Sequence, residues 1–160
     1  RSMTKDYAMA GLRLGYGVAK EEIIAALHRI CPPWNVNAPA QKAGIIAVTE
    51  EEYLRLCQVE LRKAKIYLYA ELSNLGLSPL PSEANFFLVE VGNAVTFRRD
   101  LLQKRILVRD CSSFGLPSYV RIAPRTLPDC QRLVAAIKEI RFAKGKKGGE
   151  EELNLCQRHN

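Results

Sequence analysis

The chain opens with Arg1-Ser2-Met3-Thr4-Lys5, and Ala10-Gly11-Leu12-Arg13-Leu14-Gly15-Tyr16 follows after four residues. Lys5 comes directly after two hydroxyl residues, Ser2 and Thr4, and Arg13 lies eight positions further on. A lysine amine forms a Schiff base with a carbonyl when its surroundings free it from its proton. Two hydroxyls and a guanidinium suit a phosphate dianion, because the guanidinium binds phosphate bidentately. The pattern therefore indicates a site for an aldehyde cofactor that carries a phosphate.

Ser-x-Thr-Lys followed by Gly-Leu-Arg-Leu-Gly-Tyr resembles the lysine motif of fold-type I pyridoxal-phosphate enzymes, the class I/II aminotransferases. The resemblance covers residues 1–142 and implies an α/β fold: the end of a large cofactor-binding domain, then a small α/β domain. It implies pyridoxal 5′-phosphate as the cofactor, with Lys5 as the catalytic residue and Ser2, Thr4, Lys5 and Arg13 as cofactor ligands. The alternative is that Lys5 is a solvated surface lysine, as it is in most Ser-x-Thr-Lys strings.

Length and composition limit the number of domains and the class of protein. The 160 residues are about one domain's worth, and 48% hydrophobic residues allow a real core. No apolar run approaches the roughly 18 residues that span a membrane, and no secretory signal is visible. The first residue is Arg1, and the lysine motif lies mid-chain in the family that the sequence resembles. We therefore expect the C-terminal part of a longer enzyme, whose partner is its own missing N-terminal half.

The formal net charge is +7, which is one signature of nucleic-acid binding. The basic residues are scattered, however, and do not alternate with aromatic residues, so neither a nucleic-acid nor a membrane partner is expected. The five cysteines are odd in number and widely spaced, which favours reduced thiols in a cytoplasmic protein over a disulfide framework or zinc. His28 lies in an amphipathic stretch and is expected to be structural, so no metal site is predicted.

Hydrophobic periodicity predicts the elements of the first third. Residues 12–19 read as a short buried strand, and residues 20–31 as a helix with one apolar face. Asn37 is a plausible N-cap for a second helix through Val48. Thr49 and Glu52 form a capping-box pattern that opens a long helix, and Gly76 ends it.

The domain boundary is predicted near Glu52, where this long helix begins. Residues 1–52 are then the end of the large domain, residues 53–142 are the small α/β domain, and residues 143–160 form a tail. The tail is glycine-rich and its charges come in blocks, so we expect it to be disordered.

The small domain alternates strands and helices. Strands are predicted at 85–91, 106–109 and 119–123, and helices at 94–104 and from a Thr126 cap with Asp129 at its third position. We expect the three strands in one sheet, covered on one face by helices 51–75 and 128–142.

Two arginines of this domain are candidates for substrate binding. In residues 119–123, Val120 and Ile122 share one face and Arg121 lies on the other, while Arg109 ends a predicted strand. A buried guanidinium without a partner costs several kcal/mol, so each must reach solvent or bind an anion. A salt bridge to a neighbouring carboxylate is the alternative. The resemblance implies that Arg121 holds the substrate's α-carboxylate and that Arg109 helps with a second anion.

Three stretches allow a finer comparison. Residues 33–38, 106–111 and 119–125 resemble the L-threonine-O-3-phosphate decarboxylases of cobalamin biosynthesis. That likeness implies decarboxylation of L-threonine O-3-phosphate, a small phosphorylated amino acid, to (R)-1-amino-2-propanol phosphate by a homodimer. Histidinol-phosphate aminotransferases share the lysine motif and are the alternative. A third hypothesis, of another class, is that the 160-residue chain taken alone is a non-catalytic folded piece.

Overall fold

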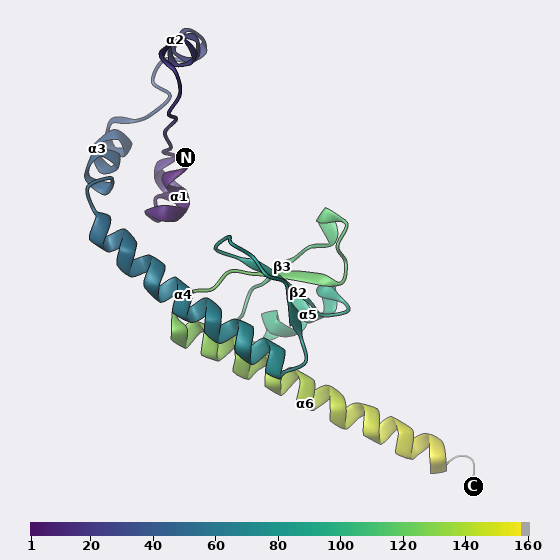
Figure 1. The fold of residues 1–160 in the computed structure, drawn as a ribbon. Helices are drawn as coiled ribbons and strands as arrows, with labels where there is room; N and C mark the ends of the chain where they lie inside the picture. The colour runs from purple at the N-terminus through teal and green to yellow at the C-terminus, as the bar shows by residue number, and fades with distance from the viewer. Residues whose placement is uncertain (158–160) are drawn as a thin grey trace. The chain divides into compact units, whose positions relative to one another are not determined.

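The computed structural model describes the backbone of residues 1–157 and the side chains of residues 1–142. The chain divides into two compact units, Arg1–Gln58 and one that begins at Val59. The division falls within helix α4 (Glu51–Asn74), a few residues beyond the position predicted from the sequence. Figure 1 shows the order of the elements along the chain.

The first unit is built mainly of helices. Its elements before α4 are α1 (Met3–Asp6), the 3-10 turn η1 (Ala10–Leu12), α2 (Glu21–Ile30) and α3 (Ala38–Ala47). The predicted strand over residues 12–19 is wrong. This segment makes one isolated bridge, between Ser2 and Gly15, and Val18 is 91% exposed. A strand needs a neighbour, and among the described residues only the opening of the chain pairs with this segment.

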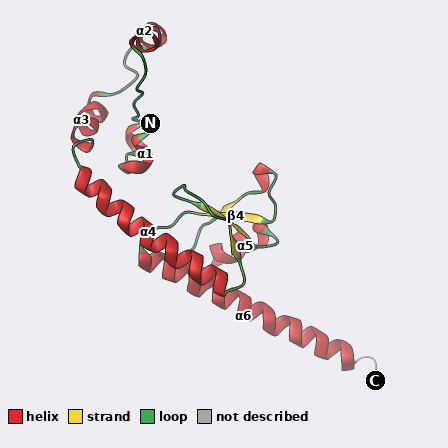
Figure 2. Cartoon of the chain, viewed as in Figure 1, coloured by secondary structure: helices red, strands yellow, loops and turns green. Residues whose placement is uncertain are grey.

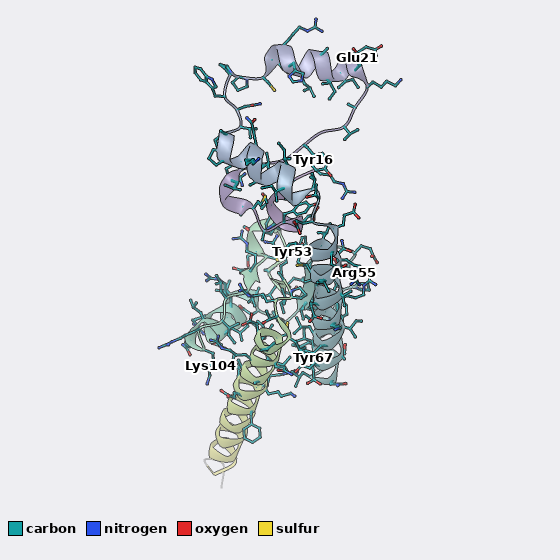
Figure 3. The ribbon with its side chains drawn as sticks, turned by 90° about the vertical axis from the view of Figure 1, so that its left-hand side faces the viewer. Tyr16, Glu21, Tyr53, Arg55, Tyr67 and Lys104 are labelled. Carbon is teal, nitrogen blue, oxygen red and sulfur yellow. The ribbon has the colours of Figure 1, made fainter. Side chains whose placement is uncertain are left out.

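The predicted caps of the helices have mixed outcomes. The side chain of Asn37 accepts a hydrogen bond from the Ala40 N–H at 2.8 Å, which confirms the predicted N-cap of α3. The capping box at Thr49 is wrong, because the Thr49 hydroxyl donates to the Ile46 carbonyl at 2.7 Å. Glu52 instead forms an exposed ion pair with Arg55, whose side chain Figure 3 shows on α4. The hydroxyl thus serves the end of α3 rather than the start of α4.

Helix α4 ends at the position predicted from Gly76. Gly76 has a φ of +68°, the left-handed conformation that glycine adopts without strain. The Leu77 N–H donates to the Leu72 carbonyl at 3.0 Å, and the Gly76 N–H donates to the Ser73 carbonyl at 2.8 Å. These two bonds form a Schellman motif, which satisfies the last carbonyls of the helix.

The second unit contains one antiparallel sheet of four short strands, shown in Figure 2. The strands are β1 (Ser78–Pro79), β2 (Phe87–Glu90), β3 (Arg109–Asp110) and β4 (Tyr119–Ile122), in the order β1-β2-β4-β3. The elements that complete the unit are α5 (Ala94–Gln103), the 3-10 turn η2 (Ser112–Phe114) and α6 (Leu127–Gln157). The three predicted strands therefore do share one sheet, and the expected α/β fold is confirmed.

Strand β3 begins later than the strand predicted over residues 106–109. Arg105 has a φ of +58°, and the Ile106 N–H donates to the Leu101 carbonyl, so these residues still belong to the turn that ends α5. The chain becomes extended against β4 only at Arg109. The hydrophobic run from residue 106 to 108 suggested a strand, but its first half closes a helix.

The core of this unit lies on one face of the sheet. Phe87 pairs with Ile122 and Val89 with Val120 across β2 and β4, and all four side chains are at most 3% exposed. Leu68 and Leu72 of α4 and Ile137 of α6 join the same cluster. Figure 1 shows α4 and α6 on the same side of the sheet, as the sequence predicted. The opposite face carries Arg109 and Arg121, with Leu88 of β2 directly beside Arg121.

Helix α6 begins with the predicted cap. The Thr126 hydroxyl donates to Asp129 Oδ2 at 2.9 Å, and the Asp129 N–H donates to the Thr126 oxygen at 3.4 Å. The backbone continues as helix to Gln157, whereas the sequence predicts a disordered tail from residue 143. Residues 158–160 of that predicted tail lie outside the described residues. Within the described part of the chain, no helix combines the length and apolarity needed to cross a bilayer.

Candidate active site

The backbone of the first unit joins the two halves of the lysine motif. The Met3 N–H donates to the Leu14 carbonyl at 3.1 Å, and the Tyr16 N–H donates to the Arg1 carbonyl at 2.8 Å. This pairing is centred on the bridge between Ser2 and Gly15. Residues that are far apart in the motif are thus held together by main-chain hydrogen bonds.

Gly15 is required by this close approach. A Cβ atom at Gly15 would lie 2.8 Å from the Arg1 carbonyl oxygen, a backbone atom that can move only with the pairing itself. Behind the pair, Met3 is 3% exposed, and a Cβ at Gly44 of α3 would approach its sulfur at 3.7 Å. Helix α3 therefore packs directly against the paired segment and supports it.

The four predicted cofactor ligands lie around this pairing. Ser2 caps α1, and its Oγ accepts from the Thr4 N–H at 3.2 Å. Lys5 lies within α1 with its side chain exposed, and Thr4 is half-buried. Arg13 is exposed and donates from Nη1 to the Ala10 carbonyl at 3.1 Å. Its φ of +53° is a left-handed conformation that is costly for a residue with a side chain.

The chemistry of these groups fits pyridoxal 5′-phosphate. Lys5 supplies a primary amine that can bind an aldehyde, and Ser2, Thr4 and Arg13 supply two hydroxyls and one guanidinium for a phosphate. A strained backbone at a polar residue is itself a frequent mark of a functional position. Arg13 adopts such a conformation next to the paired segment, as Ala8, Trp34 and Arg105 do elsewhere in the described chain.

The second unit holds the two predicted substrate arginines at paired positions. Arg109 of β3 and Arg121 of β4 are directly opposite each other in the antiparallel register. Both side chains are exposed, on the face of the sheet away from the core. The alternation predicted for Arg121, with Val120 and Ile122 buried behind it, is confirmed. Like charges at directly opposite positions destabilise a sheet unless another group compensates.

Each arginine rests on an aromatic ring. The guanidinium carbon of Arg121 lies 4.9 Å from the centre of the Phe86 ring, and that of Arg109 lies 5.3 Å from the centre of the Phe114 ring. Arg109 also donates from Nη2 to the Ser113 hydroxyl at 3.0 Å. The arginines that form ion pairs among the described side chains are others, namely Arg55, Arg99 and Arg125. The salt-bridge alternative for the arginine pair therefore finds no support in the geometry.

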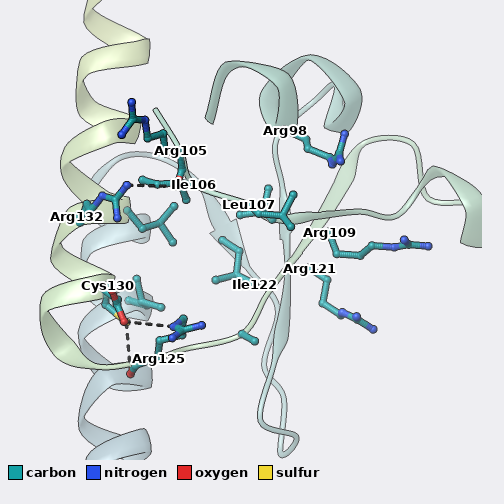
Figure 4. A pocket seen from close by; sticks show the side chains of 15 residues that line it. Arg98, Arg105, Ile106, Leu107, Arg109, Arg121, Ile122, Arg125, Cys130 and Arg132 are labelled. Atoms are coloured by element: carbon teal, nitrogen blue, oxygen red, sulfur yellow. Dashed lines mark hydrogen bonds and ion pairs between the residues drawn. The ribbon is translucent and has the colours of Figure 1, made fainter. Parts of the chain in front are cut away.

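Arg109 and Arg121 are among the residues that line a cavity of about 730 Å³, shown in Figure 4, together with apolar residues such as Leu68, Ile122 and Leu133. In this view the two arginine side chains project to the same side of the sheet, away from α6. The charged residues of the lining are mostly basic. The lining includes six arginines: Arg98, Arg105, Arg109, Arg121, Arg125 and Arg132. Among the described lining residues, the one carboxylate is Asp129, which already binds Arg125 and Thr126.

A smaller cavity of about 220 Å³ lies between Arg98, Arg109, Asp110 and Ser113. The Ser112 hydroxyl and its backbone N–H both donate to Asp110 Oδ1, at 2.6 and 2.8 Å. These bonds hold the pKa of Asp110 below its usual value, and the positive charges of Arg98 and Arg109 act in the same direction. Asp110 therefore stays ionised and fixes the loop that follows β3.

Sequence reasoning missed three residues of this region: Phe86, Phe114 and Arg98. One signal for Phe86 was available, because Phe86 and Phe87 are adjacent on an extended segment and only one of them can face the core. Phe114 and Arg98 gave no such signal. Phe114 lies in a turn and Arg98 in a helix, and the sequence does not predict which way either element faces.

Comparison with known proteins gives consistent matches. The sequence profile of the family "Aminotransferase class I and II" matches residues 1–137. A histidinol-phosphate aminotransferase of Symbiobacterium thermophilum is 42% identical over 139 residues, which are 86% of this chain and 38% of that protein. The chain thus spans well under half the length of this relative.

Two solved structures are similar along most of the chain. The histidinol-phosphate aminotransferase from Clostridium acetobutylicum has a TM-score of 0.83 at 30% identity, over 89% of this chain and 45% of that one. The L-threonine-O-3-phosphate decarboxylase from Porphyromonas gingivalis has a TM-score of 0.75 at 28% identity, over 88% of this chain and 45% of that one. Both chemistries considered from the sequence are therefore represented among similar structures.

Proposed function

Because the chain belongs to the class I and II aminotransferase family, whose members depend on pyridoxal phosphate, we propose that it is part of an enzyme acting on a small phosphorylated amino compound. In this proposal the first unit supplies the lysine and the phosphate ligands for the cofactor. The second unit supplies the arginines for the substrate.

The proposed roles of the first unit follow from its side chains. Lys5 binds the cofactor aldehyde and later holds or moves a proton at the substrate's Cα. Ser2, Thr4 and Arg13 bind the cofactor phosphate, and the pairing of residues 1–3 with residues 14–16 keeps them on one segment of structure. When bound, the cofactor supplies an electron sink that weakens the bonds at Cα.

The observation that carries the proposal for the substrate is the register of Arg109 and Arg121. Two guanidiniums at directly opposite positions, on the exposed face of a sheet, repel each other, and an anion bound between or beside them would relieve that repulsion. A substrate with a phosphate and a carboxylate supplies two anionic groups, and arginine binds both bidentately. We assign the carboxylate to Arg121 and assistance with the phosphate to Arg109.

The first candidate reaction is decarboxylation of L-threonine O-3-phosphate. The Cα–carboxylate bond breaks, carbon dioxide leaves, and Lys5 supplies the proton that replaces it at Cα. The product is (R)-1-amino-2-propanol phosphate, an intermediate of cobalamin biosynthesis. This candidate is favoured by the two-anion argument and by the likeness of residues 33–38, 106–111 and 119–125 noted in the sequence.

The second candidate is amino-group transfer with histidinol phosphate. It is favoured by the 42% identity to a histidinol-phosphate aminotransferase and by the TM-score of 0.83 to another. Here Lys5 moves a proton from Cα toward the cofactor instead of replacing a lost carboxylate. In this reaction Arg109 binds the phosphate of histidinol phosphate. Histidinol phosphate has no carboxylate, so Arg121 serves the carboxylate of 2-oxoglutarate in the other half of the transfer.

Product analysis with the intact enzyme distinguishes the candidates. Release of carbon dioxide and amino-propanol phosphate from O-phospho-L-threonine supports the first. Amino transfer between histidinol phosphate and 2-oxoglutarate, without carbon dioxide from phosphothreonine, supports the second. In either case Lys5→Ala should abolish turnover and borohydride labelling, because Lys5 is the proposed attachment point. Turnover retained by Lys5→Ala would contradict the whole proposal. We further propose that the enzyme is a cytoplasmic homodimer, which sedimentation of the intact protein tests.

A further inference from the structure

Phe86 and Phe114 of the second unit lie on the surface, each beside one arginine of the pair. Phe86 is 36% exposed and Phe114 is 60% exposed, so neither ring is buried in the core. Both rings nevertheless have a specific neighbour, because each lies against one guanidinium of the arginine pair, at 4.9 and 5.3 Å. An exposed aromatic ring gains little from burial, so its contact with a cation is its clearest interaction.

The ring of Phe86 is carried by an anchored loop. The Ser82 hydroxyl donates to the Phe86 carbonyl at 2.7 Å. Lys65 of α4 donates to the carbonyls of Ser82 and Ala84, and the Tyr69 hydroxyl donates to the Leu80 carbonyl at 2.6 Å. Side chains of α4 therefore fix the backbone of residues 80–86 and, with it, the position of the ring beside Arg121.

The ring of Phe114 is also held by its backbone. The Phe114 N–H donates to the carbonyl of Cys111 at 2.9 Å, and Cys111 is 2% exposed. Gly115, with a φ of +76°, then ends the 3-10 turn. The turn that follows β3 thus brings Phe114 back beside Arg109, the residue that begins the strand.

The arginine pair needs such support when no anion is bound. Paired residues of an antiparallel sheet have Cα atoms about 4.5–5.5 Å apart, so two unsupported guanidiniums would turn away from each other. A ring face attracts a guanidinium and lies parallel to its plane, which leaves the edge N–H groups free to donate. Each ring can therefore hold one arginine in place while its donors face an incoming anion.

We propose that Phe86 and Phe114 are positioning residues, which keep Arg121 and Arg109 oriented for a shared anionic substrate. This inference rests on the proposed function and deepens it. Each ring contacts one arginine and carries no group that could transfer a proton. Their loss therefore weakens substrate binding, while the rate of the bound complex changes little.

The test uses the intact enzyme with Phe86→Leu and Phe114→Leu, which keep an apolar side chain but remove the aromatic face. Affinity for O-phospho-L-threonine and for L-histidinol phosphate is read from the change in cofactor absorbance. We expect each variant to bind about two- to fivefold more weakly, the range of an exposed cation–π contact. KM should rise in proportion with kcat nearly constant, and Phe86→Tyr and Phe114→Tyr should restore binding. Val95→Ala, at a 58% exposed position of α5, is the control for loss of surface apolar area.

The remaining outcomes separate this inference from the proposed function. If Arg121→Lys weakens binding and the leucine variants do not, the inference is wrong and the arginine assignment stands. If the tyrosine variants bind as weakly as the leucine variants, the rings act through packing alone and the inference is also wrong. If neither the arginine nor the phenylalanine variants change affinity, both the inference and the substrate assignment fail.

Discussion

The arginine pair is defined by individual residues. Arg109 and Arg121 face each other across β3 and β4, and the structure supplies each with a ring and Arg109 with a hydroxyl. Lysine keeps the charge but loses the planar fork and most of the ring contact. We expect Arg109→Lys and Arg121→Lys each to lower kcat/KM of the intact enzyme about ten- to hundredfold, the size of a lost charge-assisted hydrogen bond. Cofactor absorbance should stay nearly unchanged, because the proposed cofactor ligands lie in the other unit.

Arg99→Lys is the matched control for these variants. Arg99 belongs to α5 of the same unit, its side chain is 67% exposed, and it lies outside both cavities. Its replacement should leave kcat/KM within about twofold, as expected for a surface ion pair. Equal kinetics in Arg121→Lys and Arg99→Lys would remove the reason for placing the substrate at the pair.

Arg13 combines a functional side chain with a strained backbone. Replacing it removes a proposed phosphate contact, which contributes on the order of 1.5–3 kcal/mol. Glycine also relieves the left-handed φ of +53°, whereas alanine does not. We therefore expect Arg13→Ala and Arg13→Gly to lose cofactor affinity to the same extent, while the Arg13→Gly variant is more stable than the Arg13→Ala variant by about 1 kcal/mol. Fluorescence titration with pyridoxal phosphate and thermal unfolding of the intact enzyme measure the two effects. Unchanged cofactor affinity in both variants would exclude Arg13 from the phosphate site.

At this scale the sequence predicted which arginines are exposed but not which residues surround them. Strand alternation is local, so it placed Arg121 correctly opposite Val120 and Ile122. The pairing of Arg121 with Arg109 depends on the register between β3 and β4, which the turn between these strands sets. No pattern of neighbouring residues in the sequence predicts that register. The contacts of Phe86 and Phe114 depend on the same register.

At the scale of the elements, the pairing of residues 1–3 with residues 14–16 depends on Gly15. A side chain at Gly15 would collide with the Arg1 carbonyl, whereas one at Gly17 would meet nothing within 4 Å. We expect Gly15→Ala to separate the two halves of the lysine motif and to weaken cofactor binding of the intact enzyme at least tenfold. Gly17→Ala should bind the cofactor as the parent does. The comparison is a cofactor titration of the two variants side by side, and equal affinities would show that the pairing does not support the site.

The start of α6 gives a prediction of pH dependence. The hydrogen bond from the Thr126 hydroxyl, and then that from Arg125, hold the pKa of Asp129 below its ordinary value of 3.8. A lowered pKa in the folded state means that Asp129 contributes stability above about pH 4, which is lost as the pH falls through its folded value. Thr126→Ala should therefore lower the free energy of unfolding at pH 7, and the difference from the parent should shrink toward pH 2. A difference that stays constant from pH 7 to pH 2 would mean that the hydroxyl acts independently of the ionised Asp129.

The elements that the sequence predicted well are those with local causes. Helices α2, α3, α4 and α6 follow from periodicity, and Asn37, Gly76 and Thr126 mark ends that depend on neighbours within a turn. The strand predicted at residues 12–19 failed, because a strand is stabilised by a partner elsewhere in the chain. The prediction of a capping box at Thr49 failed for a related reason. The Thr49 hydroxyl lies between two helices and bonds to the last turn of α3 instead of the first turn of α4.

For the molecule as a whole, the family and its α/β fold could be predicted because the lysine motif is ordered and specific, and the matches over residues 1–137 agree with it. The substrate could not be predicted with the same force. Both candidate reactions use the same lysine and the same arginine pair, and the difference lies in which bond at Cα is oriented for cleavage. That orientation depends on the complete site, and this chain spans 38% of the length of a curated relative.

The last prediction concerns the 160-residue chain by itself. Ser2, Lys5 and Arg13 are exposed, and Thr4 is half-buried, so a cofactor held by them alone would keep much of its surface in water. Charge-assisted hydrogen bonds contribute little when water competes for both partners. We therefore expect the isolated chain to bind pyridoxal phosphate at least a hundredfold more weakly than a polypeptide of its relatives' full length, and to show no turnover. Absorbance titration followed by borohydride reduction and peptide mapping makes the comparison. Micromolar binding with Lys5 as the labelled residue would show that this chain is sufficient to hold the cofactor. Carbon dioxide release by the isolated chain would further show that no other segment is needed for the reaction.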